Sequence, residues 1–238
     1  MVEINIEKTA AELVGPARAL FGDDLISLAL YGSAVGADFM LGRSDLNVVL
    51  VLRQLGLAEL KKLRTLLPSW HKLGVSTPLL LDRESLERAR DVFPMEFHDI
   101  RAQHRILHGE NLFASMVIDS RNLRYQAEHE VRGKLLHLRA LYAEAGTDRK
   151  RLEELLLVSV KAFAIIMRNL IRVQAMVAHG SYFDVLTQFE ATFAVRFPTM
   201  HELLAIRLGQ KAWPREIDDL VAPYLTEVQT LAGVVDRL

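Results

Sequence analysis

The sequence predicts an α+β fold, in which a small α/β domain is followed by an all-α helical bundle. Short apolar runs bounded by Gly, Ser and Asp, typical of buried strands, occur only before Phe113. After Phe113, long segments carry apolar residues at helical spacing. A change of pattern at one place indicates two domains rather than one alternating fold. We therefore expect one domain over residues 1–113 and a second over residues 114–238.

The first half contains segments with the apolar spacing of helices and segments with the apolar runs of strands. A helix is expected over 7–21, because its apolar residues fall on one helical face and Gly22 is a natural stop. Residues 32–40 are expected to form a turn and a short helix. Further helices are predicted over 57–73, where Pro68 breaks the pattern late, and over 83–90. Strands are predicted over 25–31, 46–52, 76–81, 92–99 and 105–108.

The second half has only helical periods. The most hydrophobic segment, residues 155–177, contains Lys161, Arg168 and Arg172. Such charges in the middle of a membrane span are costly, so we interpret this segment as a bundle helix and expect no membrane association. Helices are predicted over 119–145, 148–178, 183–194, 199–208 and 215–238.

The composition excludes several classes of function. The chain has no cysteine, which rules out disulfides, Cys-ligated zinc and thiol catalysis. Its 29 basic and 30 acidic residues give a net charge of −1, which argues against a nucleic-acid partner. The N-terminal residues show no cationic lead into an apolar stretch, so we expect a cytoplasmic protein.

One stretch carries a recognisable chemistry. The apolar run at 25–31 ends at Gly32 and Ser33, and Asp45 and Asn47 flank the start of the next apolar run. Glycine lets a phosphate approach backbone N–H groups, and the Ser33 hydroxyl adds a donor. A carboxylate at Asp45 is suited to a hard cation such as Mg²⁺, which prefers oxygen ligands. Together these residues suit a nucleotide triphosphate bound with a metal ion.

This combination resembles the nucleotidyltransferase superfamily of the polymerase-β type, through Gly32, Ser33, Asp45 and the position of Asn47. The segment from residue 25 to about 113 looks like a minimal nucleotidyltransferase domain. The helical second half is similar, in architecture, to the bundles of antibiotic- and toxin-associated nucleotidyltransferases, of the kanamycin-nucleotidyltransferase or HEPN kind. The resemblance implies binding of an NTP with Mg²⁺. It also implies transfer of a nucleoside monophosphate to a hydroxyl of a small-molecule or protein acceptor.

The sequence departs from the family pattern at one ligand position. Active members carry two carboxylates one residue apart, whereas Asn47 here stands in the second place. The family's third acid lies in a later strand, between apolar residues. Glu96 fits that pattern, with Asp99 as a reserve. We therefore assign metal binding to Asp45, Asn47 and Glu96, and catalysis to Asp45 and Glu96.

Basic residues near the motif and on the long helix are candidates for phosphate contacts. Arg43 lies two residues before the first acid. Lys161 and Arg168 share a helical face with Arg172 and His179. If that face looks toward the nucleotide, it supplies positive charge; otherwise it is the solvent side of a bundle helix.

Two functions stay open at this point. The first is an active nucleotidyltransferase. The second is a degenerate nucleotidyltransferase domain that serves as a nucleotide sensor or a scaffold for a protein partner, and Asn47 favours it because an amide brings no charge. The Leu-rich bundle would offer a surface for homo-oligomers in either case.

Overall fold

The computed structural model describes residues 6–35, 46–178 and 180–238, and two compact units make up the chain. The first unit is Met1–Ile118 and the second is Asp119–Leu238. Phe113 and Met116 pack into a core of the first unit, which is why that unit extends to Ile118.

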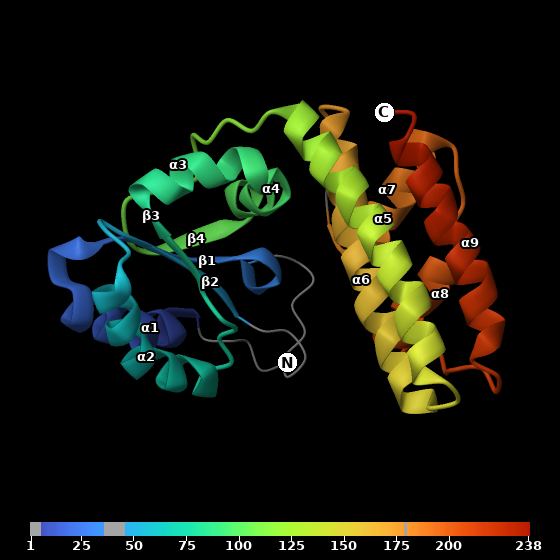
Figure 1. Cartoon of the computed structure of the whole chain (residues 1–238), viewed down its shortest axis with the longest axis horizontal. Coiled ribbons are helices and arrows are strands. Elements are labelled where there is room, and N and C mark those ends of the chain that lie inside the picture. The colour runs from blue at the N-terminus through green and yellow to red at the C-terminus, as the bar shows by residue number, and fades with distance from the viewer. Residues whose placement is uncertain (1–5, 36–45, 179) are drawn as a thin grey trace. The chain divides into compact units, whose positions relative to one another are not determined.

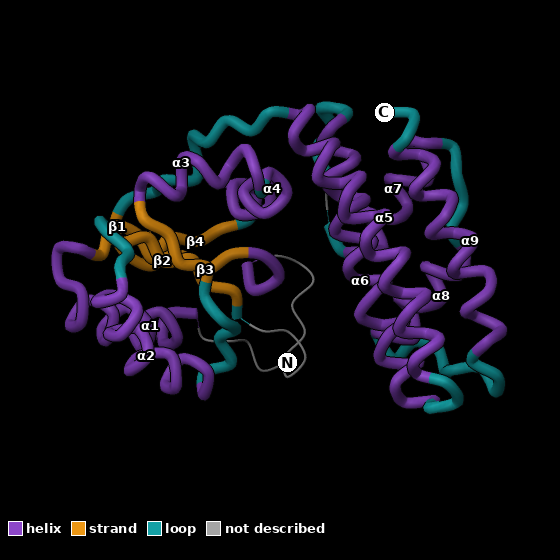
Figure 2. Tube along the Cα trace, viewed as in Figure 1, coloured by secondary structure: helices purple, strands orange, loops and turns teal. Residues whose placement is uncertain are grey.

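Among the described residues, the first unit is built on a mixed sheet with the strand order β3-β2-β1-β4 (Figures 1 and 2). The central strand β1 runs antiparallel to both β2 and β4, whereas β2 and β3 are parallel. The strands are β1 (Leu25–Tyr31), β2 (Asn47–Leu52), β3 (Leu79–Asp82) and β4 (His104–Gly109).

Both faces of this sheet are covered by helices, which explains the continuous apolar runs in β1 and β2. Leu28 and Leu50 belong to a core shared with α1 (Ile6–Phe21) and α2 (Leu57–Lys72). Alternate residues of the same strands, such as Ala29 and Val49, belong to a second core on the opposite face, formed with α3 (Arg83–Val92) and α4 (Pro94–Ala102). Figure 1 shows α1 and α2 on one side of the sheet and α3 and α4 on the other.

The strand predicted over 92–99 is wrong, because this segment ends α3 and forms most of α4. Pro94 occupies the first turn of α4, where its missing N–H costs nothing. Phe97 and Ile100, three residues apart, are buried in the second core. Pro68 also proves compatible with a helix, since it lies inside α2.

The second unit is helical in all its described elements. The helices α5 and α6 pack against each other as a hairpin that turns at Gly146, whose φ is 56°. Residue 178 was the expected end of α6, but the helix stops at Val173 and Ala175 adopts a left-handed φ of 56°. The helices are α5 (Ser120–Ala145), α6 (Arg149–Val173), α7 (Tyr182–Phe193), α8 (Pro198–Arg207) and α9 (Asp218–Val235). None of the described helices is long and apolar enough to cross a membrane.

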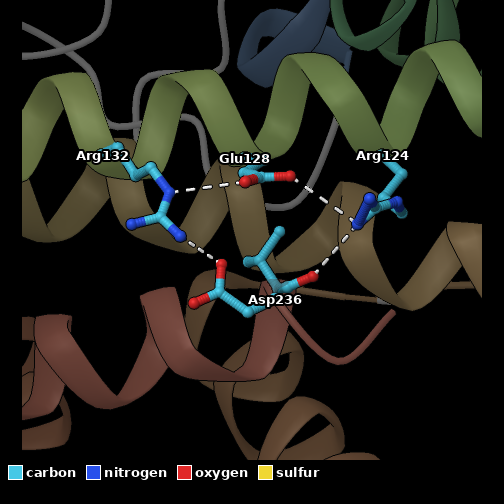
Figure 3. A network of polar contacts seen from close by, with 5 residues as sticks. Arg124, Glu128, Arg132 and Asp236 are labelled. Carbon is cyan, nitrogen blue, oxygen red and sulfur yellow. Dashed lines mark hydrogen bonds and ion pairs between the residues drawn. The ribbon is translucent and has the colours of Figure 1, made fainter.

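A polar network joins the end of α9 to α5 (Figure 3). Arg132 contacts both Glu128 on its own helix and Asp236, which follows α9. Glu128 also lies 3.6 Å from Arg124, whose guanidinium donates to the Val235 carbonyl at 3.4 Å. These groups are partly exposed, so solvent screens their charges and the network adds little to the stability of the bundle.

Two buried carboxylates cap α8 from other helices. Glu227 of α9 accepts the backbone N–H groups of Thr199 at 2.7 Å and of Met200 at 2.9 Å. Glu190 of α7 accepts the N–H of Phe197 at 2.6 Å. The N-terminal N–H groups of a helix have no intrahelical partner, so these carboxylates satisfy them inside the bundle.

Candidate functional site

Two residues of the predicted nucleotide motif, Gly32 and Asn47, lie at the end of the sheet where β1 runs into Gly32. This glycine has a φ of 70°, and a Cβ at that position would stand 3.1 Å from the Asn47 side-chain nitrogen. The Gly32 N–H donates to the Gln103 carbonyl at 3.1 Å. The glycine therefore serves the tight turn and the close approach of β2, while its own N–H is already used.

The side chain of Asn47 is oriented by a hydrogen bond from Ser76, which lies shortly before β3. Asn47 stands opposite Tyr31 in the β1–β2 register and is half-buried. Its side-chain oxygen accepts a hydrogen bond from the Ser76 hydroxyl at 3.1 Å. Because an amide oxygen has two lone pairs, one remains available to a further donor or to a cation.

Two carboxylates reach the same end of the sheet from α4. Glu96 and Asp99 lie three residues apart, which puts them on one side of the helix. Burial raises the pKa of Tyr31 above its usual value, and the charges of Glu96 and Asp99 raise it further. Glu96 was expected on a strand and lies on a helix instead. The charge of Glu96 nevertheless acts on Tyr31, the cross-strand partner of Asn47.

Sequence reasoning missed three residues at this end of the sheet: Tyr31, Ser76 and His104. His104 pairs with Tyr31 in the β1–β4 register, and its ring is held by the Ile100 carbonyl at 2.8 Å and the Asn111 side chain at 3.1 Å. The position of Tyr31, directly before Gly32, was a signal available in the sequence. Ser76 and His104 could be placed only by knowing the strand register.

Arg43 and Asp45 lie outside the described residues, as does the side chain of Ser33, whose backbone belongs to the short turn η2 (Gly32–Val35). The roles expected of these residues stay predictions. In the part of the chain that is described, no three His, Asp or Glu side chains meet to hold a metal ion.

Lys161 and Arg168 lie on α6, in the second unit. The Arg168 side chain is buried, with its guanidinium 5.3 Å from the centre of the Tyr182 ring and a hydrogen bond of 3.4 Å to the Gly180 carbonyl. Lys161 is half-buried. Arg168 thus contributes to packing of the bundle, and phosphate binding by either residue stays a prediction.

The chain is similar to a known protein in its structure but not recognisably in its sequence. No family model matches it, and no curated protein sequence matches it significantly. The crystal structure of spectinomycin adenyltransferase AAD(9) from Enterococcus faecialis, with ATP and spectinomycin, is similar with a TM-score of 0.62. The similarity covers 97% of this chain and 99% of that chain, at 9% sequence identity. The chain has the fold of this adenyltransferase.

This result confirms the fold that the resemblance implied. The α+β class, with a mixed sheet followed by a helical region, is shared with an adenyltransferase over nearly the full length of both chains. At this level of identity the similarity establishes the fold alone, since one fold can host many chemistries.

Proposed function

We propose that the chain binds an NTP with Mg²⁺ at the Gly32 end of the sheet and transfers a nucleoside monophosphate to a hydroxyl group of a small molecule. The observation that carries this proposal is the full-length similarity to an adenyltransferase whose crystal structure contains ATP and spectinomycin. Asn47 stands opposite Tyr31 in the sheet, and the charges of the α4 carboxylates Glu96 and Asp99 raise the pKa of this tyrosine, which adds support from the chain's own residues.

The residues proposed for the metal fit a hard cation. The Asn47 amide and the Glu96 carboxylate both offer oxygen, and Asp45 would add a second carboxylate. When bound, Mg²⁺ would neutralise charge on the triphosphate and lower the pKa of the attacking hydroxyl. Ser33 would donate its hydroxyl to a phosphate oxygen, as would backbone N–H groups that follow Gly32.

The proposed reaction is an in-line displacement at the α-phosphorus. The acceptor oxygen forms a bond to phosphorus while the bond to the pyrophosphate oxygen breaks, and Glu96 takes the proton of the acceptor hydroxyl. The chain contributes by holding the acceptor and the nucleotide in line and by keeping the Glu96 carboxylate next to them. A small-molecule acceptor is favoured over a protein because the similar adenyltransferase structure holds spectinomycin.

The test is a calorimetric titration of the whole chain with ATP, GTP, CTP and UTP, each with and without Mg²⁺. We expect at least one nucleotide to bind only with Mg²⁺, and Asp45→Ala to abolish that binding. Asp91→Ala is the matched control, since Asp91 is an exposed acid on α3. Unchanged affinity in Asp45→Ala would contradict the proposed site.

A second function is favoured by one observation, the amide at position 47. If none of the four nucleotides binds, the domain is better explained as a degenerate nucleotidyltransferase that acts as a scaffold for a partner. If a nucleotide binds and no acceptor is ever modified, a nucleotide sensor is the better explanation.

A further inference from the structure

A cavity of about 450 Å³ lies in the first unit, at the end of the sheet where β1 begins. Its walls come from the last turn of α1, the short 3-10 turn η1 (Gly22–Asp24), β1 and β4. The lining residues are Arg18, Ala19, Gly22, Asp23, Leu25 and His108. Leu25 and Tyr31 are the two ends of β1, so the cavity is about 20 Å along this strand from Gly32. It is therefore separate from the proposed nucleotide site.

A β-bulge in β4 directs His108 to the side of the sheet that carries this cavity. Leu28 stands opposite His108 and Ala29 opposite Ile106, which leaves Leu107 as an extra residue between them. Leu28 belongs to the core that α1 covers, and cross-strand partners point to the same face of a sheet. Strict alternation from Ile106, which packs into the other core, would have put His108 on the opposite face. Bulges re-aim side chains in this way.

Two opposite charges line the same cavity. Arg18 belongs to the last turn of α1 and Asp23 to η1, and both are exposed. Arg53 holds η1 in place, because its guanidinium donates to the Asp23 carbonyl at 3.3 Å and lies 3.5 Å from the Asp24 carboxylate. The charge of Asp24 is thereby paired. Within the described part of the chain, the side chains of Arg18, Asp23 and His108 form no hydrogen bond and no ion pair.

We propose that this cavity binds a small zwitterion that carries a carboxylate and an ammonium group, as free amino acids do. The Arg18 guanidinium suits the carboxylate, to which the His108 ring can donate a further hydrogen bond. The Asp23 carboxylate accepts from the ammonium group. A ligand with only a negative charge would be repelled by Asp23, and one with only a positive charge by Arg18. The volume of the cavity is in the range of small-molecule sites.

This proposal goes beyond the proposed nucleotidyltransferase function and does not depend on it, so its test contains no nucleotide. The full chain is titrated calorimetrically with each of the standard L-amino acids. The amino acid that binds best is then compared with two derivatives. Its N-acetyl derivative keeps the carboxylate and lacks the ammonium group, and its methyl ester keeps the ammonium group and lacks the carboxylate.

We expect at least one amino acid to bind, and both derivatives to bind at least about tenfold more weakly. Arg18→Gln and Asp23→Asn should each weaken binding by about tenfold, the loss typical of a hydrogen bond to a charged group. His108→Phe, which keeps a ring without a donor, should weaken it about fivefold, as for a neutral hydrogen bond. Arg64→Gln is the matched control, since Arg64 is an exposed arginine on α2.

The variants of Arg18 and Asp23 should unfold in urea like the native chain, because both side chains are exposed. A weaker affinity in these variants then reports the site rather than the fold. No binding of any amino acid at millimolar concentration would overturn the proposal. Equal affinity for the N-acetyl derivative or for the methyl ester would also overturn it, because a single charge would then suffice. An equal loss in Arg64→Gln would mean that binding occurs elsewhere.

Discussion

The proposed site has one negative charge fewer than the family pattern implies, because Asn47 carries an amide in place of a carboxylate. Asn47 is the first residue of β2, and its side-chain oxygen accepts a hydrogen bond from the Ser76 hydroxyl. What it lacks is the negative charge. The missing charge was visible in the sequence, because asparagine stands where the family resemblance implies a second acid. The orientation by Ser76 was not, because it depends on β3 lying parallel to β2.

Asn47→Asp should therefore strengthen Mg²⁺-dependent nucleotide binding. Aspartate has the same shape as asparagine, and the Ser76 hydroxyl can still donate to it, so the backbone has no reason to move. An added charged ligand should improve affinity by about tenfold. Calorimetry with the nucleotide that binds best measures this. Asn122→Asp, which adds the same charge in the second unit, should change nothing; an equal gain there would mean a non-specific charge effect.

Glu227 is a buried carboxylate inside the helical bundle. It accepts two backbone N–H groups at the start of α8, and burial raises its pKa above 4.5 against the opposing effect of those hydrogen bonds. A glutamine keeps one acceptor oxygen but turns an NH₂ group toward a donor. We expect Glu227→Gln to lower the free energy of unfolding by roughly 1–3 kcal/mol, as for an unsatisfied buried group.

Urea unfolding at pH 7 checks this expectation. Glu216→Gln is the matched control, since the Glu216 side chain is 75% exposed. Equal stability of the two variants would show that the N–H groups of α8 find other partners when Glu227 is changed.

At the scale of elements, local sequence predicted most of the first unit and failed at α4. The strand predicted over residues 25–31 coincides with β1, because an apolar run of that length between Gly22 and Gly32 has few alternatives. The segment around Phe97 alternates like a strand over a few residues. A helix forms there because Pro94 is favourable in a first helical turn. In a helix, Phe97 and Ile100 also point to the same side and are buried in one core.

The cap of α3 gives an element-scale prediction with a pH dependence. The Asp82 side chain accepts the Ser85 N–H at 2.7 Å, and hydrogen bonds from the side chain and then the backbone of Ser85 lower the pKa of Asp82 below 3.8. An acid with a lowered pKa in the folded state stabilises it above its unfolded pKa, and that contribution is lost as the pH falls through the folded value. Asp82→Ala should cost about 1 kcal/mol at pH 7.

Asp82→Asn separates the cap from its titration. Asparagine caps a helix as well as aspartate does but carries no proton equilibrium in this range. Its stability at pH 7 should match the native chain, and the loss of stability below pH 4 should be smaller. A native and an Asp82→Asn chain with the same acid profile would argue against a contribution from this carboxylate.

At the scale of the whole molecule, each unit has a core of its own. The first unit buries its apolar residues on the two faces of the sheet. The second unit buries aromatic residues of several helices, among them Phe163 against Tyr224 and Phe189 against Phe197. Each unit thus buries a set of its own apolar residues.

Residues 119–238 should therefore fold when expressed alone. We expect a helical far-UV circular dichroism spectrum and a single cooperative transition in urea, because a domain with a closed core unfolds as a unit. The full-length chain is the reference for the helical signal. A fragment that unfolds without a cooperative transition would show that the second unit depends on the first.

The sequence by itself determined the fold class, the strand that leads into Gly32, the helical character of the second half and the missing charge at position 47. These follow from periodicity and residue type, which act over a few neighbouring residues. Only the tertiary structure decided that 94–102 is a helix, that the charge of its Glu96 acts on Tyr31, that Ser76 donates to Asn47 and that Arg168 stacks inside the bundle. Those features depend on contacts between segments far apart in the chain, and local pattern carries no information about which distant partner will be present.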